Sequence, residues 1–281
     1  MEQVSKSLKA FSSASSSKEL TYRDKLERDA AAFNKAPGDR HLQDGYECQL
    51  CNNKGIYYVV REDDKGEPYV TGTECRCYPI RHTLMQMKRS GLNNVLKEKT
   101  FDKFETSDKW QRAIKEAAER YAADPKGWFF IGGQSGCGKT HLCTAICRQF
   151  LLEGRRVAYM LWRDEVVKIK SAVTDSEEYA KAINAFKTAE VLYIDDLFKA
   201  GKTAEATMQR PTPADVNVAF EILNYRYNDP ASITIVSSEL TAAELIDIDE
   251  ATGGRLFERA QPISIGKDRK KNYRLRGALE L

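Results

Sequence analysis

A phosphate-loop pattern constrains the fold of this chain more than any other feature. Residues 133–140 read GQSGCGKT, with the spacing G-x-x-x-x-G-K-T. The apolar run WFFIG (128–132) precedes them, and a helix-like stretch from Lys139 to about Glu153 follows. The pattern is specific when a strand precedes it and a helix follows it, whereas the alternative is a chance glycine-rich turn. We therefore expect a strand, an ATP-binding loop and a helix in this order.

Each part of this loop has a predicted task. The glycines let the backbone turn its N–H groups toward phosphates, and the helix N-terminus adds partial positive charge. Lys139 should reach the β- and γ-phosphates, and the Thr140 hydroxyl should bind Mg²⁺. The residues expected to hold ATP are Gly133, Gln134, Ser135, Gly136, Cys137, Gly138, Lys139, Thr140 and His141.

A second acidic motif lies about fifty residues further on. The run VLYIDDLF is an apolar strand that ends in Asp195 and Asp196. We expect Asp195 to hold Mg²⁺ through water and Asp196 to polarise the attacking water. The alternative for Asp196 is a cap of a turn or helix.

The rest of the C-terminal part alternates between strands and helices. Strands are expected at 128–132, 157–162, 191–195, 233–238 and 262–265, and helices at 107–124, 139–153, 213–228 and in the segments between. This alternation predicts the α/β class, with a parallel sheet sandwiched by helices.

Polar residues further along the chain are candidates for nucleotide sensing. The strand ITIVSSEL should lie between the two motif strands, so that Ser237, Ser238 or Glu239 faces the γ-phosphate; we favour Ser238 or Glu239, and a strand-to-helix cap is the alternative. Arg255 and Arg259 lie one helical turn apart and form either an arginine finger for a neighbouring subunit or two surface arginines.

Four cysteines have the spacing of a metal site. Cys48 and Cys51 form a C-x-x-C pair, and Cys75 and Cys77 form a C-x-C pair. The segment between the pairs looks like a hairpin with turn residues 63–66, which is the plan of a zinc ribbon. So small a segment needs a metal to fold, which favours Zn²⁺ over four free thiols. His82 is a possible substitute ligand.

Composition excludes some classes of protein. The chain has 281 residues, 42% of them hydrophobic, and a net charge of +3, so charge alone does not indicate a nucleic-acid binder. The cluster KDRKKNYRLR, which contains Tyr273, could bind nucleic-acid phosphates or form a solvated tail. No apolar run approaches the length that spans a bilayer, and the first twenty residues lack the core of a secretory signal. We therefore expect a cytoplasmic protein without a membrane partner.

Together these motifs resemble a known family. The chain is similar to DnaC/DnaI-type replicative helicase loaders, which are AAA+ ATPases related to the IstB transposition ATPases. The resemblance rests on the cysteine pairs, RSGLNNVLKEKTFDKF, GKTHL, VLYIDDL, ILNYRYND, ITIVSSEL and GGRLFERA, and covers residues 46 to 276. The zinc-bearing part looks more like the DnaI branch, including its phage and prophage relatives. One departure is Phe198, because a glycine often follows DDL in this family.

The resemblance implies a function and partners. Such proteins bind a hexameric DnaB-type helicase through the N-terminal region and help to place it on single-stranded DNA, as a homo-oligomer or in a ring with the helicase. By motif match, Lys139, Thr140, Asp195 and Asp196 carry the ATPase chemistry. One arginine of the GGRLFERA segment would be the finger, and Arg274 or Arg276 a second sensor. The alternative function is that of an IstB-like regulatory ATPase that acts on duplex DNA.

These expectations divide the chain into three parts. Residues 1–45 are predicted as a flexible N-terminal segment with a helix over about 18–35, which either faces solvent or docks a partner. Residues 46–97 are predicted as the zinc-binding, helicase-interacting module and linker. Residues 98–281 are predicted as the AAA+ ATPase domain.

Overall fold

The computed structural model describes residues 20–199 and 210–275, and these form two compact units. The first unit comprises residues 20–43 and 47–75. The second comprises residues 44–46, 76–199 and 210–275. The division places residues 76–97, which the sequence grouped with the zinc-binding module, in the same unit as the phosphate loop.

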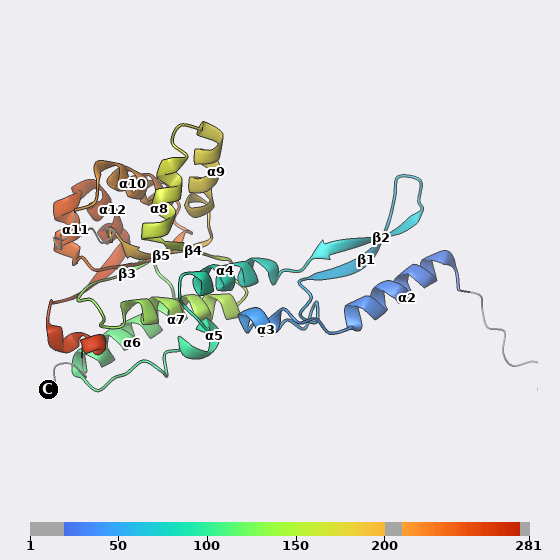
Figure 1. Cartoon of the computed structure of the whole chain (residues 1–281), viewed down its shortest axis with the longest axis horizontal. Helices are drawn as coiled ribbons and strands as arrows, with labels where there is room; N and C mark the ends of the chain where they lie inside the picture. The colour runs from blue at the N-terminus through green and yellow to red at the C-terminus, as the bar shows by residue number, and fades with distance from the viewer. Residues whose placement is uncertain (1–19, 200–209, 276–281) are drawn as a thin grey trace, which may run out of the picture. The chain divides into compact units, whose positions relative to one another are not determined.

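A helix and a two-stranded hairpin build the first unit (Figure 1). Helix α2 (Tyr22–Lys35) begins with a capping box between Thr21 and Asp24. Strands β1 (Ile56–Glu62) and β2 (Pro68–Glu74) pair antiparallel across the turn predicted at 63–66. The Asn34 side chain exchanges two 2.8 Å hydrogen bonds with the backbone of Tyr58, which fixes α2 against β1. The hairpin expected between the cysteine pairs is therefore confirmed.

The second unit contains a five-stranded parallel sheet. The strands are β3 (Trp128–Gly133), β4 (Val157–Leu161), β5 (Val191–Leu197), β6 (Ile233–Ser238) and β7 (Ala260–Ile265). Their order is β4-β5-β6-β3-β7, and every pair is parallel. Strand β6 lies between the two motif strands, as predicted. The carboxyl ends of β3, β5 and β6 consequently meet at one edge of the sheet.

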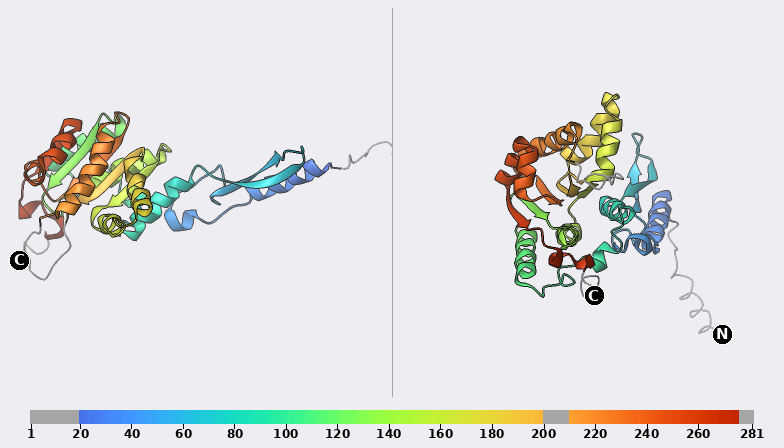
Figure 2. Two further views of the ribbon diagram at one scale, coloured as in Figure 1. Left: turned by 90° about the horizontal axis from the view of Figure 1, so that it is seen from above. Right: turned by 60° about the vertical axis from the view of Figure 1, so that its left-hand side comes forward.

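Helices cover both faces of this sheet (Figures 1 and 2). One face packs against α4 (Tyr78–Arg89), α5 (Val95–Glu98), α6 (Lys109–Ala123) and α7 (Lys139–Leu152). The other face packs against α8 (Trp162–Ser171), α9 (Ser176–Lys187), α10 (Pro213–Tyr227), α11 (Ala242–Ile248) and α12 (Glu250–Arg259). The short turns η1 (Arg269–Lys271) and η2 (Tyr273–Leu275) end the described chain. The predicted α/β sandwich is confirmed.

Burial on both faces explains why the strands are almost entirely apolar. Strands β3 and β6 are buried at every residue, and in β5 only Asp196 is half-buried. The boundary at Trp162 differs from the prediction, because this residue begins α8 instead of ending β4. Its indole is 2% exposed and packs edge-on against Phe198, so the residue is buried in the core although it belongs to a helix and not to a strand.

A buried arginine joins α10 to the opposite end of the sheet from the phosphate loop. Arg226 is 0% exposed and donates to the carbonyls of Phe186, Lys187, Ala189 and Ile233 and to the Thr234 hydroxyl, at 2.6–3.2 Å. Phe186 and Lys187 end α9, so these carbonyls have no partner within their own helix. The cation therefore caps α9 and ties it to β6.

Helix α4 packs against β4 through polar as well as apolar contacts. The Thr83 hydroxyl donates to the Val157 carbonyl, and Ile80, Leu84 and Met87 enter the core. At the C-terminus of α4, the Ser90 hydroxyl donates to the Tyr159 hydroxyl at 3.2 Å. This end of α4 is therefore in direct contact with a residue of the sheet.

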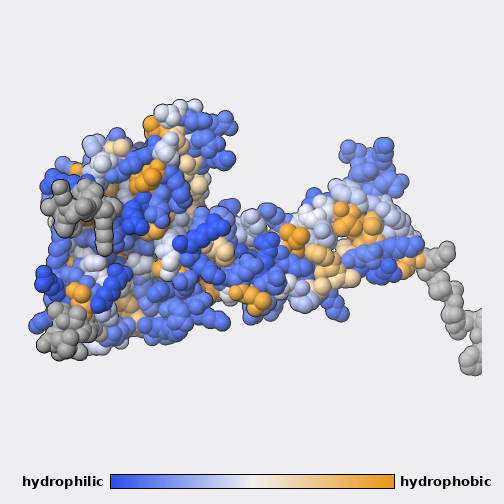
Figure 3. Space-filling model, in the orientation of Figure 1, coloured by the Kyte–Doolittle hydropathy of each residue, from blue (hydrophilic) through white to orange (hydrophobic). Residues whose placement is uncertain are grey.

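No helix in residues 20–199 and 210–275 is long and apolar enough to cross a membrane. Hydrophilic residues dominate the face drawn in Figure 3, with small groups of hydrophobic residues over the hairpin and elsewhere. Two of the exposed apolar side chains of the hairpin are Tyr69 and Val70.

Candidate nucleotide-binding site

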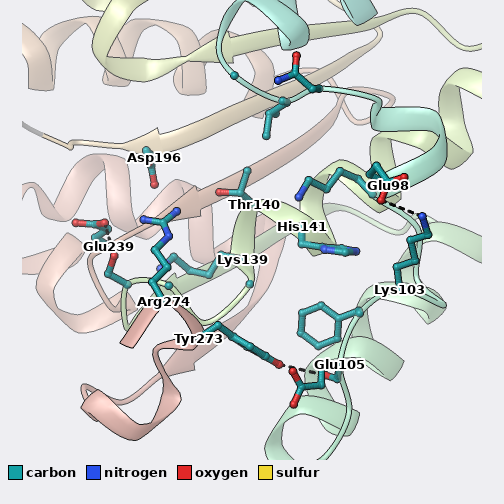
Figure 4. Close-up of a pocket in the computed structure, with 18 of the residues that line it drawn as sticks. Glu98, Lys103, Glu105, Lys139, Thr140, His141, Asp196, Glu239, Tyr273 and Arg274 are labelled. Carbon is teal, nitrogen blue, oxygen red and sulfur yellow. Dashed lines mark hydrogen bonds and ion pairs between the residues drawn. The ribbon is translucent and has the colours of Figure 1, made fainter. Parts of the chain in front are cut away.

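A cavity of about 790 Å³ opens where the phosphate loop meets the carboxyl ends of β5 and β6. Figure 4 shows Lys139, Thr140, Asp196, Glu239 and Arg274 around one end of it. Its lining residues come from six parts of the chain: Gly91–Asn93; Glu98, Lys99, Lys103–Glu105; Ser135, Gly136, Gly138–His141; Asp196, Lys199; Glu239; and Tyr273, Arg274. The structure thus brings the two predicted motifs to one cavity.

The phosphate loop adopts a conformation that favours glycine, as Gly136 and Gly138 illustrate. Gly136 has φ +71° and Gly138 has φ +96°, in the left-handed region. A Cβ atom at Gly136 would lie 2.0 Å from Asn272 Oδ1, and one at Gly138 would lie 2.5 Å from Phe104 Cε2. Any other residue would therefore be strained by the positive φ and would displace the side chain of Asn272 or Phe104.

Lys139 is held inside this loop. Its ammonium donates to the carbonyls of Gly133 and Gln134, at 2.9 and 2.7 Å. Cys137, by contrast, is 0% exposed and its thiol donates to the Gln134 carbonyl, so its side chain belongs to the loop's own packing. Burial raises the pKa of this thiol. Gln134 turns outward, and its Oε1 accepts from the Asp268 N–H at 2.8 Å.

Asp195 lies at the centre of a network of hydroxyl groups. Its Oδ1 accepts from Thr140, Tyr193 and Ser237, at 3.1, 2.7 and 2.6 Å. Its Oδ2 accepts from Tyr159 at 3.1 Å. Asp195 is 4% exposed, and its four donors come from four different elements: α7, β4, β5 and β6. The orientation of Asp195 is therefore fixed before any ligand binds.

Burial dominates the electrostatics of Asp195. Desolvation, together with the charge of Asp196, raises the pKa of the Asp195 carboxyl, while the hydroxyl groups of Ser237, Tyr193 and Tyr159 lower it in part. A buried anion with too few opposing charges attracts a cation. A divalent cation near Thr140 and Asp195 fits this donor set, because a hydroxyl and a carboxylate oxygen are the hard ligands that Mg²⁺ prefers.

Asp196 differs from Asp195 in backbone and in partners. It has φ +58°, and its N–H donates to the Ser237 hydroxyl at 3.1 Å. Its carboxylate is 21% exposed and faces the cavity, where the Lys199 ammonium lies 2.8 Å away. Lys199 lies 3.0 Å from Glu239 as well, and the Ser135 hydroxyl donates to the same carboxylate.

The charges of this cluster reinforce one another. Burial lowers the pKa of Lys199, but the two carboxylates outweigh it and the net pKa is raised. Burial raises the pKa of Glu239, but Lys199, Ser135 and Lys139 outweigh it and the net pKa is lowered. Both groups are therefore charged at neutral pH.

The structure separates the three polar residues at the end of β6. Ser238 is 0% exposed, and its hydroxyl donates to the Leu197 carbonyl and accepts from the Leu240 N–H. Its side chain therefore points away from the cavity, contrary to our preference for it as a sensor. Ser237 supports Asp195, and Glu239 reaches the cavity. Alternation along a strand explains the difference, because successive side chains point to opposite faces.

The C-terminal segment crosses the phosphate loop. The Tyr273 N–H donates to the Gly136 carbonyl at 3.0 Å, and its hydroxyl contacts Gln111 and the Glu105 carbonyl. Arg274, the next residue, extends into the cavity between Glu239 and Thr140 in Figure 4. Arg276, the alternative to Arg274, lies outside the described residues.

Sequence reasoning missed the other end of the cavity. Gly91–Asn93 and Phe104 belong to the segment RSGLNNVLKEKTFDKF, which entered the prediction only as part of a resemblance. His141 packs edge-on against Phe104 at 5.6 Å, and its Nε2 lies 2.8 Å from the Thr100 carbonyl. Since a carbonyl only accepts, Nε2 carries a proton. Burial lowers the pKa of His141, so the ring is neutral at neutral pH.

The two candidate finger arginines have different surroundings. Arg259 donates to the carbonyls of Tyr227, Asp229 and Pro230 and lies over the Trp128 ring. Arg255 donates to Asn224 Oδ1 and the Ala251 carbonyl. Arg255 also lies over the Phe220 and Tyr227 rings, so all its partners come from α10 and its own helix. Arg259 is held more firmly, by three backbone carbonyls and the Trp128 ring. Neither lines the cavity of its own chain.

The four cysteines predicted to bind zinc come together. The sulfur atoms of Cys48, Cys51, Cys75 and Cys77 all lie within 4.8 Å of one another, and each residue is at most 9% exposed. Sulfur atoms at the corners of a tetrahedron around Zn²⁺ are separated by about 3.8 Å, and Cys48 and Cys75 lie 3.7 Å apart. His82 is exposed and is not part of the group.

Donors around the sulfur atoms support the same interpretation. The Gly55 N–H donates to the Cys51 sulfur at 3.2 Å, and Arg81 Nε donates to the Cys77 sulfur at 3.4 Å. Arg81 is itself 3% exposed and bonds both carboxylate oxygens of Asp44. Such outer hydrogen bonds stabilise thiolates that hold a metal. The cysteine set therefore fits Zn²⁺.

Comparison with known proteins places these motifs in a family. The sequence profile described as "IstB-like ATP binding protein" matches residues 72–268. The "Phage-like element PBSX protein XkdC" of Bacillus subtilis (strain 168) is 31% identical over 249 residues, 83% of this chain and 87% of that protein. The "Replicative helicase loader DnaC" of Escherichia coli (strain K12) is 26% identical over 113 residues, 39% of this chain and 46% of that protein.

A solved structure shares the fold. "Replication initiator DnaA bound to AMPPCP and single-stranded DNA" superposes with a TM-score of 0.51 at 22% identity, covering 67% of this chain and 56% of that chain. The family profile spans more than half of the chain and includes the phosphate loop and the strand that ends in Asp195. The chain is therefore an ATPase, and it belongs to the IstB-like ATP-binding family of AAA+ proteins.

Proposed function

We propose that this ATPase loads a DnaB-type replicative helicase onto single-stranded DNA at the start of DNA replication. The observation that carries the proposal is the combination of an IstB-like ATPase unit with a four-cysteine cluster and hairpin near its N-terminus. Similarity to proteins named replicative helicase loaders supports it, although that similarity covers 39% of this chain. Similarity to a phage-like element protein is in keeping with a phage or prophage origin.

ATP would bind with its phosphates in the loop. Lys139 lies within its loop and would move its ammonium from two backbone carbonyls to the β- and γ-phosphates. Thr140 and Asp195 would hold Mg²⁺, which neutralises phosphate charge when bound. The hydroxyl network around Asp195 fixes the carboxylate in advance, so little reorganisation is needed on binding.

Asp196 is the candidate to orient the attacking water. It is the carboxylate at the end of β5 that lines the cavity, where the γ-phosphate of a bound ATP would lie. Arg274 would contact the phosphates from the C-terminal segment, and Glu239 takes the sensing position that Ser238 does not occupy.

Arg255 is the better candidate for an arginine finger. A finger must reach the ATP of a neighbouring subunit, and Arg259 is engaged with three backbone carbonyls and an indole of its own chain. This role requires a homo-oligomer or a ring assembled with the helicase. The basic residues of η1 would bind DNA phosphates.

The cysteine cluster would hold Zn²⁺ and stabilise the hairpin unit. Four buried thiols with N–H donors to two of them fit a structural zinc site, in which all ligands come from the protein. We propose that this unit forms the contact with the helicase.

The family name supports a second candidate, a transposition-type regulatory ATPase that acts on duplex DNA. Co-purification distinguishes the two functions. The chain and the replicative helicase of the same source would be mixed with ATP or with ADP, and the complex mass measured. A complex of defined stoichiometry that is lost when residues 1–75 are deleted supports helicase loading. Absence of a complex with either nucleotide rejects it and leaves the ATPase assignment intact.

A further inference from the structure

Lys199 is a cation in the ATP cavity that no motif predicted. It follows the second acidic motif in DDLFK, where the resembled family often has glycine at position 198 instead of phenylalanine. Its ammonium lies 2.8 Å from Asp196 and 3.0 Å from Glu239. It therefore joins the carboxylate after β5 to the carboxylate after β6, across the mouth of the phosphate loop.

The backbone conformation of residues 196–198 directs Lys199 toward the cavity. Asp196 and Phe198 have φ of +58° and +61°, which is costly for residues other than glycine. The pairing of β5 with β6 is irregular between Ile194 and Leu197. Phe198 is 5% exposed and packs edge-on against Trp162 at 5.4 Å, which anchors the turn. The Lys199 N–H then bonds the Asp196 carbonyl at 2.9 Å, so the chain turns back toward the cavity.

Lys199 compensates two carboxylates that face the phosphate loop. Asp196 and Glu239 both line the space that faces Lys139 and Thr140. Two carboxylates there would repel the γ-phosphate of an incoming ATP. Lys199 offsets their charge, and its side chain is 35% exposed, so it can accept a further partner from the cavity.

We propose that Lys199 is a ligand of the γ-phosphate and allows the protein to distinguish ATP from ADP. An ammonium group has three N–H donors, and the bonds to Asp196 and Glu239 occupy two of them. The third donor reaches a γ-phosphate oxygen, while the β-phosphate remains with Lys139 and the loop amides. Lys199 then forms a charge-assisted hydrogen bond that ATP gains and ADP lacks.

The inference rests on the phosphate loop as the ATP site and is independent of helicase loading. Its test measures the affinity of the full-length chain for the non-hydrolysable β,γ-methylene analogue of ATP and for ADP, each with Mg²⁺, by titration calorimetry. In Lys199→Met we expect affinity for the analogue to fall about tenfold or more, and affinity for ADP to change less than about twofold. Lys199→Arg should retain the preference of the wild type.

Lys168→Met is the matched control. Lys168 pairs with Glu165 at 2.7 Å on α8, and its side chain is 67% exposed. Both nucleotides should bind this variant as they bind the wild type. Equal weakening of both nucleotides by Lys199→Met, or no weakening of either, overturns the proposal. If the wild type binds neither nucleotide, the phosphate-loop site itself is rejected, and this outcome is distinct from the first two.

A second variant keeps the proposal testable if Lys199→Met does not fold. Glu239→Gln removes one of the two carboxylates that hold the ammonium and one negative charge facing the γ-phosphate. The ratio of analogue affinity to ADP affinity should rise. A ratio that falls or stays the same contradicts the role of Lys199, because the freed ammonium would then contribute nothing to γ-phosphate binding.

Discussion

Replacing Arg226 by methionine should destabilise the ATPase unit strongly. Arg226 is fully buried without a carboxylate among its hydrogen-bond acceptors, which are four carbonyls and one hydroxyl. Two of these carbonyls end α9. Methionine fills much of the same space but donates no hydrogen bond, so the acceptors lose their partner while they stay buried.

The magnitude follows from two opposing contributions. Burial lowers the pKa of Arg226 to about 10, and this shift corresponds to about 3 kcal/mol that the fold loses by keeping the guanidinium charged. Methionine removes that cost. Each buried acceptor left without a donor costs roughly 1–3 kcal/mol, and five acceptors outweigh the gain. Five such acceptors amount to about 5–15 kcal/mol, so we expect a net loss of at least about 2 kcal/mol in the free energy of unfolding. Arg226→Lys should lose less, because an ammonium donates three bonds.

Urea denaturation followed by tryptophan fluorescence measures the stability of the unit that contains Arg226. All three tryptophans, at positions 110, 128 and 162, belong to the unit that carries the sheet. The protein should be free of nucleotide, because a ligand adds its own stabilisation. The m-value should be unchanged, so that the shift in midpoint reports stability alone.

Arg163→Met provides the control for this experiment. Arg163 is 54% exposed and forms a surface ion pair with the adjacent Asp164, so the loss of stability on its replacement should stay within about 0.5 kcal/mol. A loss below about 1 kcal/mol for Arg226→Met would refute the reasoning. It would mean that water or other donors satisfy the α9 carbonyls in the variant.

Four further predictions concern the sites. Lys139→Ala should abolish ATP binding in calorimetry, and an unchanged affinity would reject the phosphate-loop site. Asp196→Asn should bind ATP normally and hydrolyse it at least about 10²-fold more slowly than the wild type. Hydrolysis at the wild-type rate would mean that Asp196 only caps the turn after β5. Elemental analysis should find about one zinc per chain, and chelation should unfold the hairpin by circular dichroism; a folded, metal-free hairpin contradicts the zinc site. Arg255→Ala should lower ATP turnover of the assembled protein with a smaller fall in melting temperature than Arg259→Ala, which should act mainly on stability; the reverse pattern would exchange their roles.

Local patterns were sufficient to predict the parts of the site that depend on nearby residues. The strand before Gly133, the helix after Lys139 and the apolar strand that ends in Asp195 each have a signature within a short window. The position of β6 between the motif strands followed from the architecture that those motifs imply. The cysteine pairs also predicted their own convergence, because paired thiols at this spacing have few alternatives.

Contacts between distant residues could not be predicted in the same way. Lys199 meets Glu239 forty residues later, and that approach depends on two left-handed residues other than glycine, which no propensity indicates. Tyr159 and Tyr193 looked like ordinary strand residues, although both hydroxyls donate to Asp195. Ser238 and Glu239 point in different directions, and the sequence alone does not indicate which of two successive residues at the end of a strand faces the cavity.

Helix α4 gives the two candidate metal sites a common element. Cys77 immediately precedes this helix, and Ser90 ends it, where the Ser90 hydroxyl bonds Tyr159 and Tyr159 in turn bonds Asp195. Twelve helical residues span about 18 Å. If a metal at the cysteines shifts α4, the shift reaches the carboxylate through two hydrogen bonds. Linkage then requires reciprocity: the factor by which zinc changes the affinity for Mg²⁺ equals the factor by which Mg²⁺ changes the affinity for zinc.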